Sequence, residues 1–254
     1  MIDAFKVLWK TIKDIWEDML LLVLMNVFTI VCGILFFAGV GIPIYLGLTA
    51  PSEQSSPLIA MLIIALVLSI PTSIPYAGAL FGLYSVSNRI ANGFAISWEY
   101  YFTQFRQNIF KAWRYFAFSI VVTFLIVINF LWYPQSFPRQ DWVGWVMGAW
   151  LAALFFWTAI QFYVFPFYIE QENKSWRIAL KNAALVAGAN PIFTLVLFVV
   201  AAALTIFSMV VVPPLFVLLG LVFWVMIGTQ AIINRVAKYR ARLEEQPVKP
   251  KPKR

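Results

Sequence analysis

Histidine is absent from this chain of 254 residues, and cysteine occurs once, at Cys32. Without histidine there is no Ser-His or Cys-His nucleophile pair, no imidazole ligand for zinc or haem, and no histidine proton relay. A phosphate-binding GxxxxGK[ST] run, a GxGxxG run and a CxxC pair are also missing, so nucleotide hydrolysis would need another chain. We therefore expect no cofactor, no metal site and no enzyme, although chemistry based on serine, tyrosine, lysine or the pair Glu170 and Glu172 stays open.

Charged residues are scarce, at 12% of the chain, and none of the 11 acidic residues lies deep in an apolar run. Proton or sodium coupling through a carboxylate at the membrane midplane therefore has no residue to use. The net charge of +8 comes from cations clustered between the apolar runs and on a C-terminal tail. Anionic lipid headgroups commonly bind such clusters, so we expect a lipid bilayer partner and no nucleic acid.

Apolar residues make up 62% of the chain and its mean hydropathy is +0.83, more than one water-surrounded core could bury. A helix needs about 20 apolar residues to cross a membrane, and it satisfies its own backbone groups. The sequence predicts an all-α, polytopic integral membrane protein with six transmembrane helices. The six predicted spans are Met19 to Ile42, Leu58 to Tyr84, Trp113 to Trp132, Val143 to Tyr168, Ile192 to Val211, and Leu215 to Asn234. Ser56, Asp141 and Asn190 are suitable N-cap residues for the second, fourth and fifth spans.

Lysine and arginine positions predict the orientation. With six spans, 18 of the 19 cations lie on one side, and only Arg139 lies on the other. By the positive-inside rule the 18 are cytoplasmic, so both termini of this multi-pass cell-membrane protein are expected in the cytoplasm. An odd number of spans would abolish the asymmetry.

Three regions are expected: an interfacial amphipathic helix over residues 1–18, a six-span membrane domain over 19–240, and a disordered Lys/Pro tail over 241–254. In the first helix the apolar face is predicted to comprise Phe5, Leu8, Trp9, Ile12, Ile15 and Trp16. Two further cytoplasmic amphipathic helices are predicted after Ser97 and Ser175. These three helices fit either the lipid headgroup region or a docking surface for a cytoplasmic partner.

Polar residues in the inner halves of the spans predict a cavity that opens to the cytoplasm. The candidate ligand-cavity residues are Asn26, Thr72, Ser73, Gln161, Thr229 and Gln230. Pro71, Pro75 and Pro166 are predicted helix breaks at the same depth, and broken spans often mark transporter binding sites. Uncharged side chains favour a neutral, sugar-like ligand over an ion. Helix-to-helix hydrogen bonds and simple proline kinks are the alternative.

Three stretches of this sequence carry a family resemblance. IPTSIPYAGALFGLYSVSNRI, WEYYFTQFRQNIFKAW and SWRIALKNAALVAGANP resemble the YesL-like bacterial family of integral membrane proteins, a domain of unknown function. The resemblance extends to about Arg240, and the loop with Pro134 and Pro138 and the Lys-Pro tail depart from the family. Members are often associated with carbohydrate uptake, which implies a small permease or an accessory subunit with transporter partners. A structural or regulatory scaffold that recruits partners through cytoplasmic helices and the basic tail is the alternative.

Overall fold

The computed structural model describes residues 2–50, 57–211 and 213–244. Every regular element in these ranges is helical, so the predicted all-α class is confirmed. The elements in chain order are α1 (Ile2–Glu17), α2 (Met19–Thr49), α3 (Pro57–Thr72), α4 (Ile74–Ala91), α5 (Trp98–Ser136), α6 (Trp142–Glu170), α7 (Trp176–Ala189), α8 (Pro191–Val210), α9 (Pro213–Leu215), the π-helical turn η1 (Phe216–Gly220) and α10 (Leu221–Glu244). The predicted N-cap Ser56 and residues 245–254 of the tail lie outside the described ranges.

Five described segments are long and apolar enough to cross a membrane: α2, α5, α6, α8 and the stretch Pro213–Ala241. The predicted span from Leu58 to Tyr84 is instead two helices, α3 and α4, which meet at Ser73 with a bend of 62°. Counting this bent pair as one span makes six. The bend lies between Pro71 and Pro75, and each proline removes one backbone donor from the helix.

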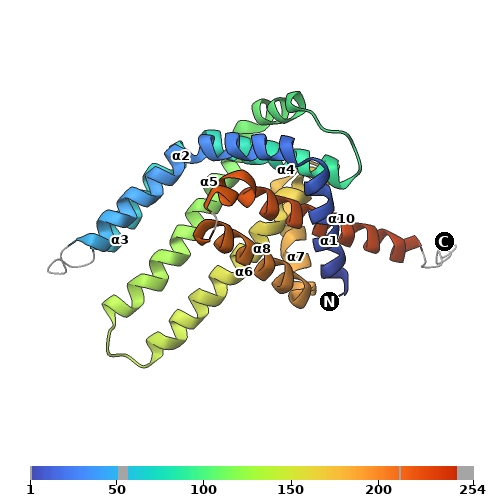
Figure 1. The fold of residues 1–254 in the computed structure, drawn as a ribbon. Helices are drawn as coiled ribbons and strands as arrows, with labels where there is room; N and C mark the ends of the chain where they lie inside the picture. Colours follow the sequence, from blue (N-terminus) through green and yellow to red (C-terminus); the bar gives the residue numbers. More distant parts are fainter. Residues whose placement is uncertain (1, 51–56, 212, 245–254) are drawn as a thin grey trace, which may run out of the picture.

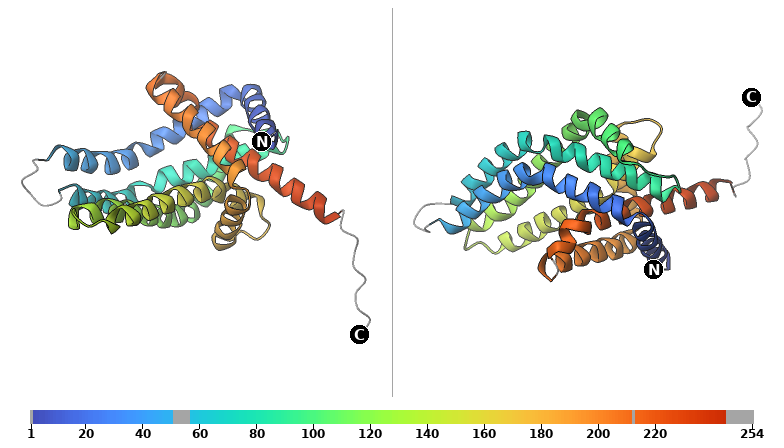
Figure 2. Two further views of the ribbon diagram at one scale, coloured as in Figure 1. Left: turned by 90° about the horizontal axis from the view of Figure 1, so that it is seen from below. Right: turned by 45° about the horizontal axis from the view of Figure 1, so that its top comes forward.

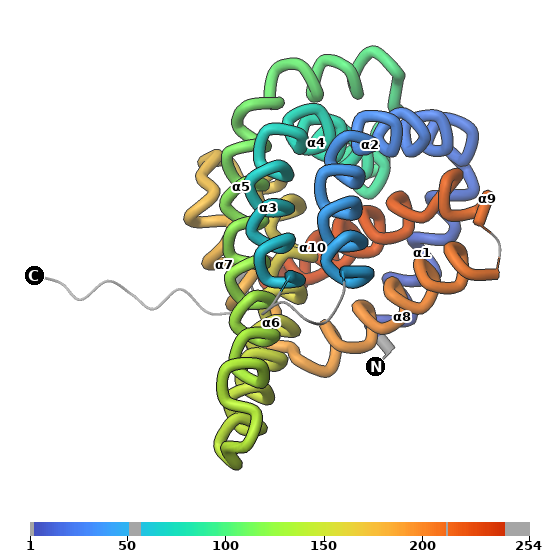
Figure 3. Tube along the Cα trace, turned by 90° about the vertical axis from the view of Figure 1, so that its left-hand side faces the viewer, coloured from blue at the N-terminus to red at the C-terminus, as the bar shows by residue number. Residues whose placement is uncertain are grey.

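Two antiparallel helix pairs frame the molecule (Figures 1 and 3): α2 packs beside α3, and α5 packs beside α6. Figure 3 shows the α5–α6 pair reaching beyond the other helices. Helix α4 packs against α5, α2 and α6, while α10 packs against α4, α6, α8 and α1. The buried side chains gather on α4, on the second half of α6 and on α10, so these three segments form the core.

A glycine lets α10 approach α6 closely. Pro166 lies inside α6 without interrupting it, so this predicted break does not form. Because proline has no N–H, the carbonyl of Phe162 lacks its usual partner within the helix. That carbonyl lies against Gly228, where a Cβ atom would come within 2.7 Å of the oxygen. The backbone group freed by the proline therefore faces a packed helix instead of a ligand.

The amphipathic segments differ from the prediction in two ways. The segment after Ser97 is not a separate helix, because α5 runs unbroken from Trp98 to Ser136. In α1 the six apolar residues do not share one face: Ile15 is buried and Leu8 half-buried against the bundle, whereas the other four are exposed. The packed face of α1 consists of Ala4, Val7 and Thr11 instead of the aromatic residues. Helix α10 also continues to Glu244, past the predicted start of the tail at residue 241.

Candidate functional site

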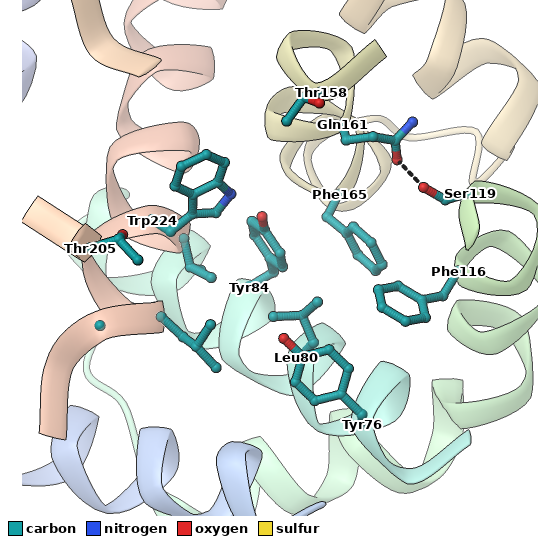
Figure 4. A pocket seen from close by; sticks show the side chains of 13 residues that line it. Tyr76, Leu80, Tyr84, Phe116, Ser119, Thr158, Gln161, Phe165, Thr205 and Trp224 are labelled. Atoms are coloured by element: carbon teal, nitrogen blue, oxygen red, sulfur yellow. Dashed lines mark hydrogen bonds between the residues drawn. The ribbon is translucent and has the colours of Figure 1, made fainter. Parts of the chain in front are cut away.

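A cavity of about 260 Å³ lies between α4, α5, α6, α8, η1 and α10 (Figure 4). The residues that line it are Tyr76, Leu80, Tyr84, Phe116, Ser119, Thr158, Gln161, Phe165, Thr205, Gly220, Leu221, Trp224 and Val225. This volume is near the lower end of ligand pockets in proteins. None of the lining side chains carries a charge at neutral pH, so the cavity suits an uncharged occupant.

Aromatic rings form most of the cavity wall. Tyr84 stacks on Phe165 with 5.0 Å between ring centroids and 6° between planes. Tyr76 meets Phe116 edge to face at 5.5 Å. Trp224 forms another part of the wall. The ring of Phe162 packs against it edge to face, with 5.1 Å between the ring centroids. Offset stacks and edge-to-face pairs are the favoured arrangements of aromatic side chains, so the wall is held in a defined shape.

Gln161 supplies the strongest polar feature of the cavity. Its Oε1 accepts hydrogen bonds from Tyr115 Oη at 2.6 Å and from Ser119 Oγ at 3.0 Å. Its Nε2 is buried and has no hydrogen-bond partner among the described residues. Leaving a buried amide donor unpaired costs about 1 to 3 kcal/mol, so such groups usually have a water or a ligand as partner. Gln161 therefore has hydrogen-bonding capacity that the protein itself does not use.

Three donors of other residues face the cavity. Figure 4 shows the phenol oxygens of Tyr76 and Tyr84 and the indole nitrogen of Trp224 turned toward the space between the side chains. In the described part of the chain, none of the three donates a hydrogen bond to another residue. Thr158 and Thr205 each donate to a carbonyl of their own helix at 2.8 Å, which leaves their oxygens able to accept. The cavity thus combines flat apolar walls with several dispersed donors and acceptors.

The polar residues proposed from the sequence do not converge on this cavity, and only Gln161 lines it. Asn26 Nδ2 donates to the carbonyl of Val217 in η1 at 2.7 Å. Gln230 Nε2 donates to Asp14 Oδ2 on α1. Both amides join helices to each other, so the predicted site of converging amides is wrong. Depth along a span places residues in one layer, but it does not decide which neighbour each side chain faces.

The proposed hydroxyl residues bond within their own helices. Thr72 donates to the carbonyl of Leu68 at 2.7 Å, and Thr229 donates to that of Val225 at 2.8 Å. Ser73, at the break, donates to the carbonyl of Ile70 at 2.8 Å. These are the ordinary back-bonds of hydroxyl side chains in helices. We find no ligand-binding role for them in this arrangement.

The break between Pro71 and Pro75 is also satisfied by protein groups. At the bend, the carbonyl of Ile70 accepts two side-chain hydrogen bonds, from Trp113 Nε1 and from Ser73 Oγ, each at 2.8 Å. Backbone groups that lose their helical partner inside a membrane must find another within the protein. The indole of Trp113 bonds a backbone carbonyl at the bend and ties α3 to α5.

The site predicted from the sequence does not include the aromatic lining, because that prediction rests on amide and hydroxyl residues alone. One signal was present: Tyr76, Leu80 and Tyr84 recur every four residues, which places them on one face of a helix. Gln161 and Phe165 have the same spacing on α6. Nothing in the sequence indicated that these two faces meet.

Comparison with protein-family models, with curated proteins and with solved structures finds no match. The resemblance to the YesL-like family therefore stays a prediction, and the site is interpreted from its own geometry.

Proposed function

We propose that this chain is a multi-pass protein of the cell membrane that binds a small, uncharged, hydroxylated ligand in the aromatic cavity. The observation that carries the proposal is an uncharged wall of aromatic rings, from which the phenols of Tyr76 and Tyr84 and the indole N–H of Trp224 face the cavity. A sugar-like molecule matches both the rings and these donors, because it has apolar C–H faces for the rings and hydroxyl groups for the phenols and the indole N–H. An ion would lose its hydration without gaining an opposite charge.

The proposed role is transport-related, as a small permease or as an accessory subunit of a carbohydrate uptake system. The site supports it by position, since its lining comes from the core segments of α4, α6 and α10 and not from an exposed loop. The resemblance to the YesL-like family, whose members accompany carbohydrate uptake, points the same way. Transporter subunits would then be the natural partners.

A six-span topology with both termini in the cytoplasm belongs to the same proposal. It treats α3 and α4 as one broken span, and it places 18 of the 19 cations on the cytoplasmic side. In a Cys32→Ser background, a cysteine at Gln140 should react with an impermeant maleimide added outside the cell. A cysteine at Asn173 should react only after permeabilisation, and labelling of intact cells at 173 would exclude this topology.

Ligand binding is tested by titrating the purified protein with a panel of neutral mono- and disaccharides. Intrinsic fluorescence reports on the site because Trp224 lines it, and calorimetry provides an independent measure. Gln161→Leu should weaken binding about tenfold or more, because the lining loses its amide and Tyr115 and Ser119 lose their common acceptor. Gln107→Leu, at an exposed position of α5, is the matched control. No saturable binding by any member of the panel, or equal binding by both variants, would contradict the proposal.

A scaffold role is the second candidate, and exposed aromatic residues on the proposed cytoplasmic side favour it. Phe94, after α4, and Phe110, on α5, are each 61% exposed. If they recruit a protein partner, Phe94→Ser with Phe110→Ser should abolish its co-purification from native membranes while leaving saccharide binding unchanged. Loss of the same partner from Gln161→Leu would favour the transport role instead.

A further inference from the structure

Helix α1 presents three different faces, and the first is sealed against the bundle. Ala4, Val7 and Thr11 are each at most 3% exposed, and α1 packs on α10 and α8. Polar contacts reinforce both ends of this face. Lys238 Nζ lies 2.5 Å from Asp3 Oδ2 at the start of α1, and Gln230 donates to Asp14 near its end. The position of α1 on the bundle is therefore defined by the protein itself.

The second face is an exposed apolar stripe, which we call the aromatic stripe: Phe5, Trp9, Ile12 and Trp16. Their spacing of four, three and four residues places them in one line along a helix. Trp9 is 74% exposed and Trp16 is 75% exposed, although tryptophan is usually well buried. Large, contiguous exposed apolar surfaces of this kind mark a membrane or protein contact.

The third face is charged. Lys6 and Lys13 are exposed, and Lys13 pairs with Glu17 at 3.6 Å. At about 100° per residue, the two lysines lie roughly a quarter turn from the aromatic stripe and on the side away from Leu8. The stripe thus has the bundle on one flank and basic side chains on the other.

The position of α1 also matters. Figures 1 and 2 show α1 turned crosswise to α2, the first long apolar helix. Apolar exposure continues from α1 into the start of α2, where Leu20 is 76% exposed. A helix that lies crosswise to the spans at their end is placed to lie along the membrane surface.

We propose that the aromatic stripe inserts into the headgroup region of a bilayer leaflet that contains anionic lipid. Tryptophan prefers this layer because its ring is apolar and its N–H is polar. The flanking Lys6 and Lys13 complement anionic headgroups, which attract basic residues at the membrane surface. The continuous apolar surface into α2 extends the contact toward the acyl chains. This interaction is separate from ligand binding in the cavity and does not depend on it.

The test uses the full-length protein with Cys32→Ser, reconstituted in vesicles of phosphatidylcholine and phosphatidylglycerol. A nitroxide label is attached to a single cysteine at Phe5, at Ile12 or, as a water-facing control, at Glu17. A label at Leu35 of α2, 63% exposed in a span, is the lipid-facing control. Collision rates with oxygen, which concentrates in lipid, and with a water-soluble nickel chelate are then measured.

Labels at positions 5 and 12 should favour oxygen over nickel several times more than the label at 17, approaching the ratio at 35. Lys6→Gln with Lys13→Gln should lower that ratio at position 12 when phosphatidylglycerol is present and leave it unchanged in pure phosphatidylcholine. Low collision rates with both reagents at 5 and 12 would mean that protein covers the stripe, and water-like rates would mean that nothing does. Either result, or no effect of the lysine substitutions, would overturn the proposal.

Discussion

Helices α3 and α4 follow each other with one residue between them, yet their surroundings differ greatly. In α3, the apolar PLIAMLIIALVLSIPT, only Leu62, Ala65 and Ser69 are buried. In α4, which is rich in glycine, alanine and serine, 13 of 18 residues are buried. Moving an apolar side chain from lipid into protein gains little, so close helix packing relies on small residues and good fit. In this protein, strong hydrophobicity marks the more exposed helix and small residues mark the core helix.

The largest test of this comparison removes one ring from α4. Phe81 is 4% exposed and meets Phe165, Tyr168 and Trp176 edge to face. Phe81→Ala should lower the free energy of unfolding by about 3 kcal/mol, because a cavity replaces these contacts. Ile63→Ala on α3, where the side chain is 50% exposed, should cost less than about 1 kcal/mol. Dodecyl sulfate titration followed by circular dichroism measures both, and equal losses would break the comparison.

The second test adds a side chain to α4 at a position that is tightly packed against α5. A Cβ at Gly82 would lie 2.9 Å from the ring of Tyr101 and 3.2 Å from its carbonyl oxygen. Gly82→Val should therefore destabilise the protein by about 1 to 3 kcal/mol. Gly148→Val in α6, where a Cβ meets nothing within 4 Å, is the control. The same titration should show a loss for the first variant only, and tolerance of Gly82→Val would argue against close packing of α4 on α5.

The third test concerns the junction between the two helices. Trp113→Phe keeps a ring but removes the indole donor that reaches the carbonyl of Ile70. Losing this hydrogen bond should cost about 1 kcal/mol. Trp132→Phe, at a residue that is 41% exposed, should be nearly neutral. Hydrogen exchange at Ile74 and Ala77 should also speed up in Trp113→Phe alone; unchanged exchange there would mean that the break does not depend on this contact.

The smallest effects are expected at two of the acidic residues of α1, the buried Asp14 and the half-buried Asp3. Burial raises the pKa of Asp14 above its usual 3.8, against the opposing effects of Lys10 and the hydrogen bond from Gln230. A raised pKa favours the protonated form in the folded state, so this contribution is complete in acid and is lost as the pH rises through the raised value. The hydrogen bond from Lys238 lowers the pKa of Asp3, so its contribution is present at neutral pH and is lost as the pH falls.

Asp14→Asn should therefore raise the thermal midpoint at neutral pH, and the gain should shrink in acid. Asp3→Asn should lower the midpoint at neutral pH, and the loss should shrink in acid. Each shift should correspond to less than about 1 kcal/mol, because Lys10 and Gln230 partly offset the desolvation of Asp14, and water screens the half-buried Asp3. Melting curves from acidic to neutral pH check the opposite slopes, and parallel behaviour of the two variants would contradict the assigned surroundings.

Much of the fold could be predicted because membrane helices leave a strong signal. Helices α6 and α8 begin directly after Asp141 and Asn190, as predicted, although neither side chain caps its helix with a hydrogen bond. The candidate site was harder to predict. Asn26 and Gln230 looked like ligand groups, but their partners, Val217 and Asp14, are 191 and 216 residues away in sequence. No local pattern shows that such distant groups will meet.

The sequence by itself determined that this chain is helical and apolar enough for five or six membrane crossings, because only a helix satisfies its own backbone along a long apolar run. Only the tertiary structure decided how each helix is turned about its axis. That rotation directs the rings of Tyr76 and Tyr84 into the cavity. It also lets Trp113 donate a hydrogen bond to the carbonyl of Ile70, and it leaves Trp9 exposed. The physical reason is that lipid and protein interior are equally apolar, so hydrophobicity alone cannot choose between the two sides of a helix.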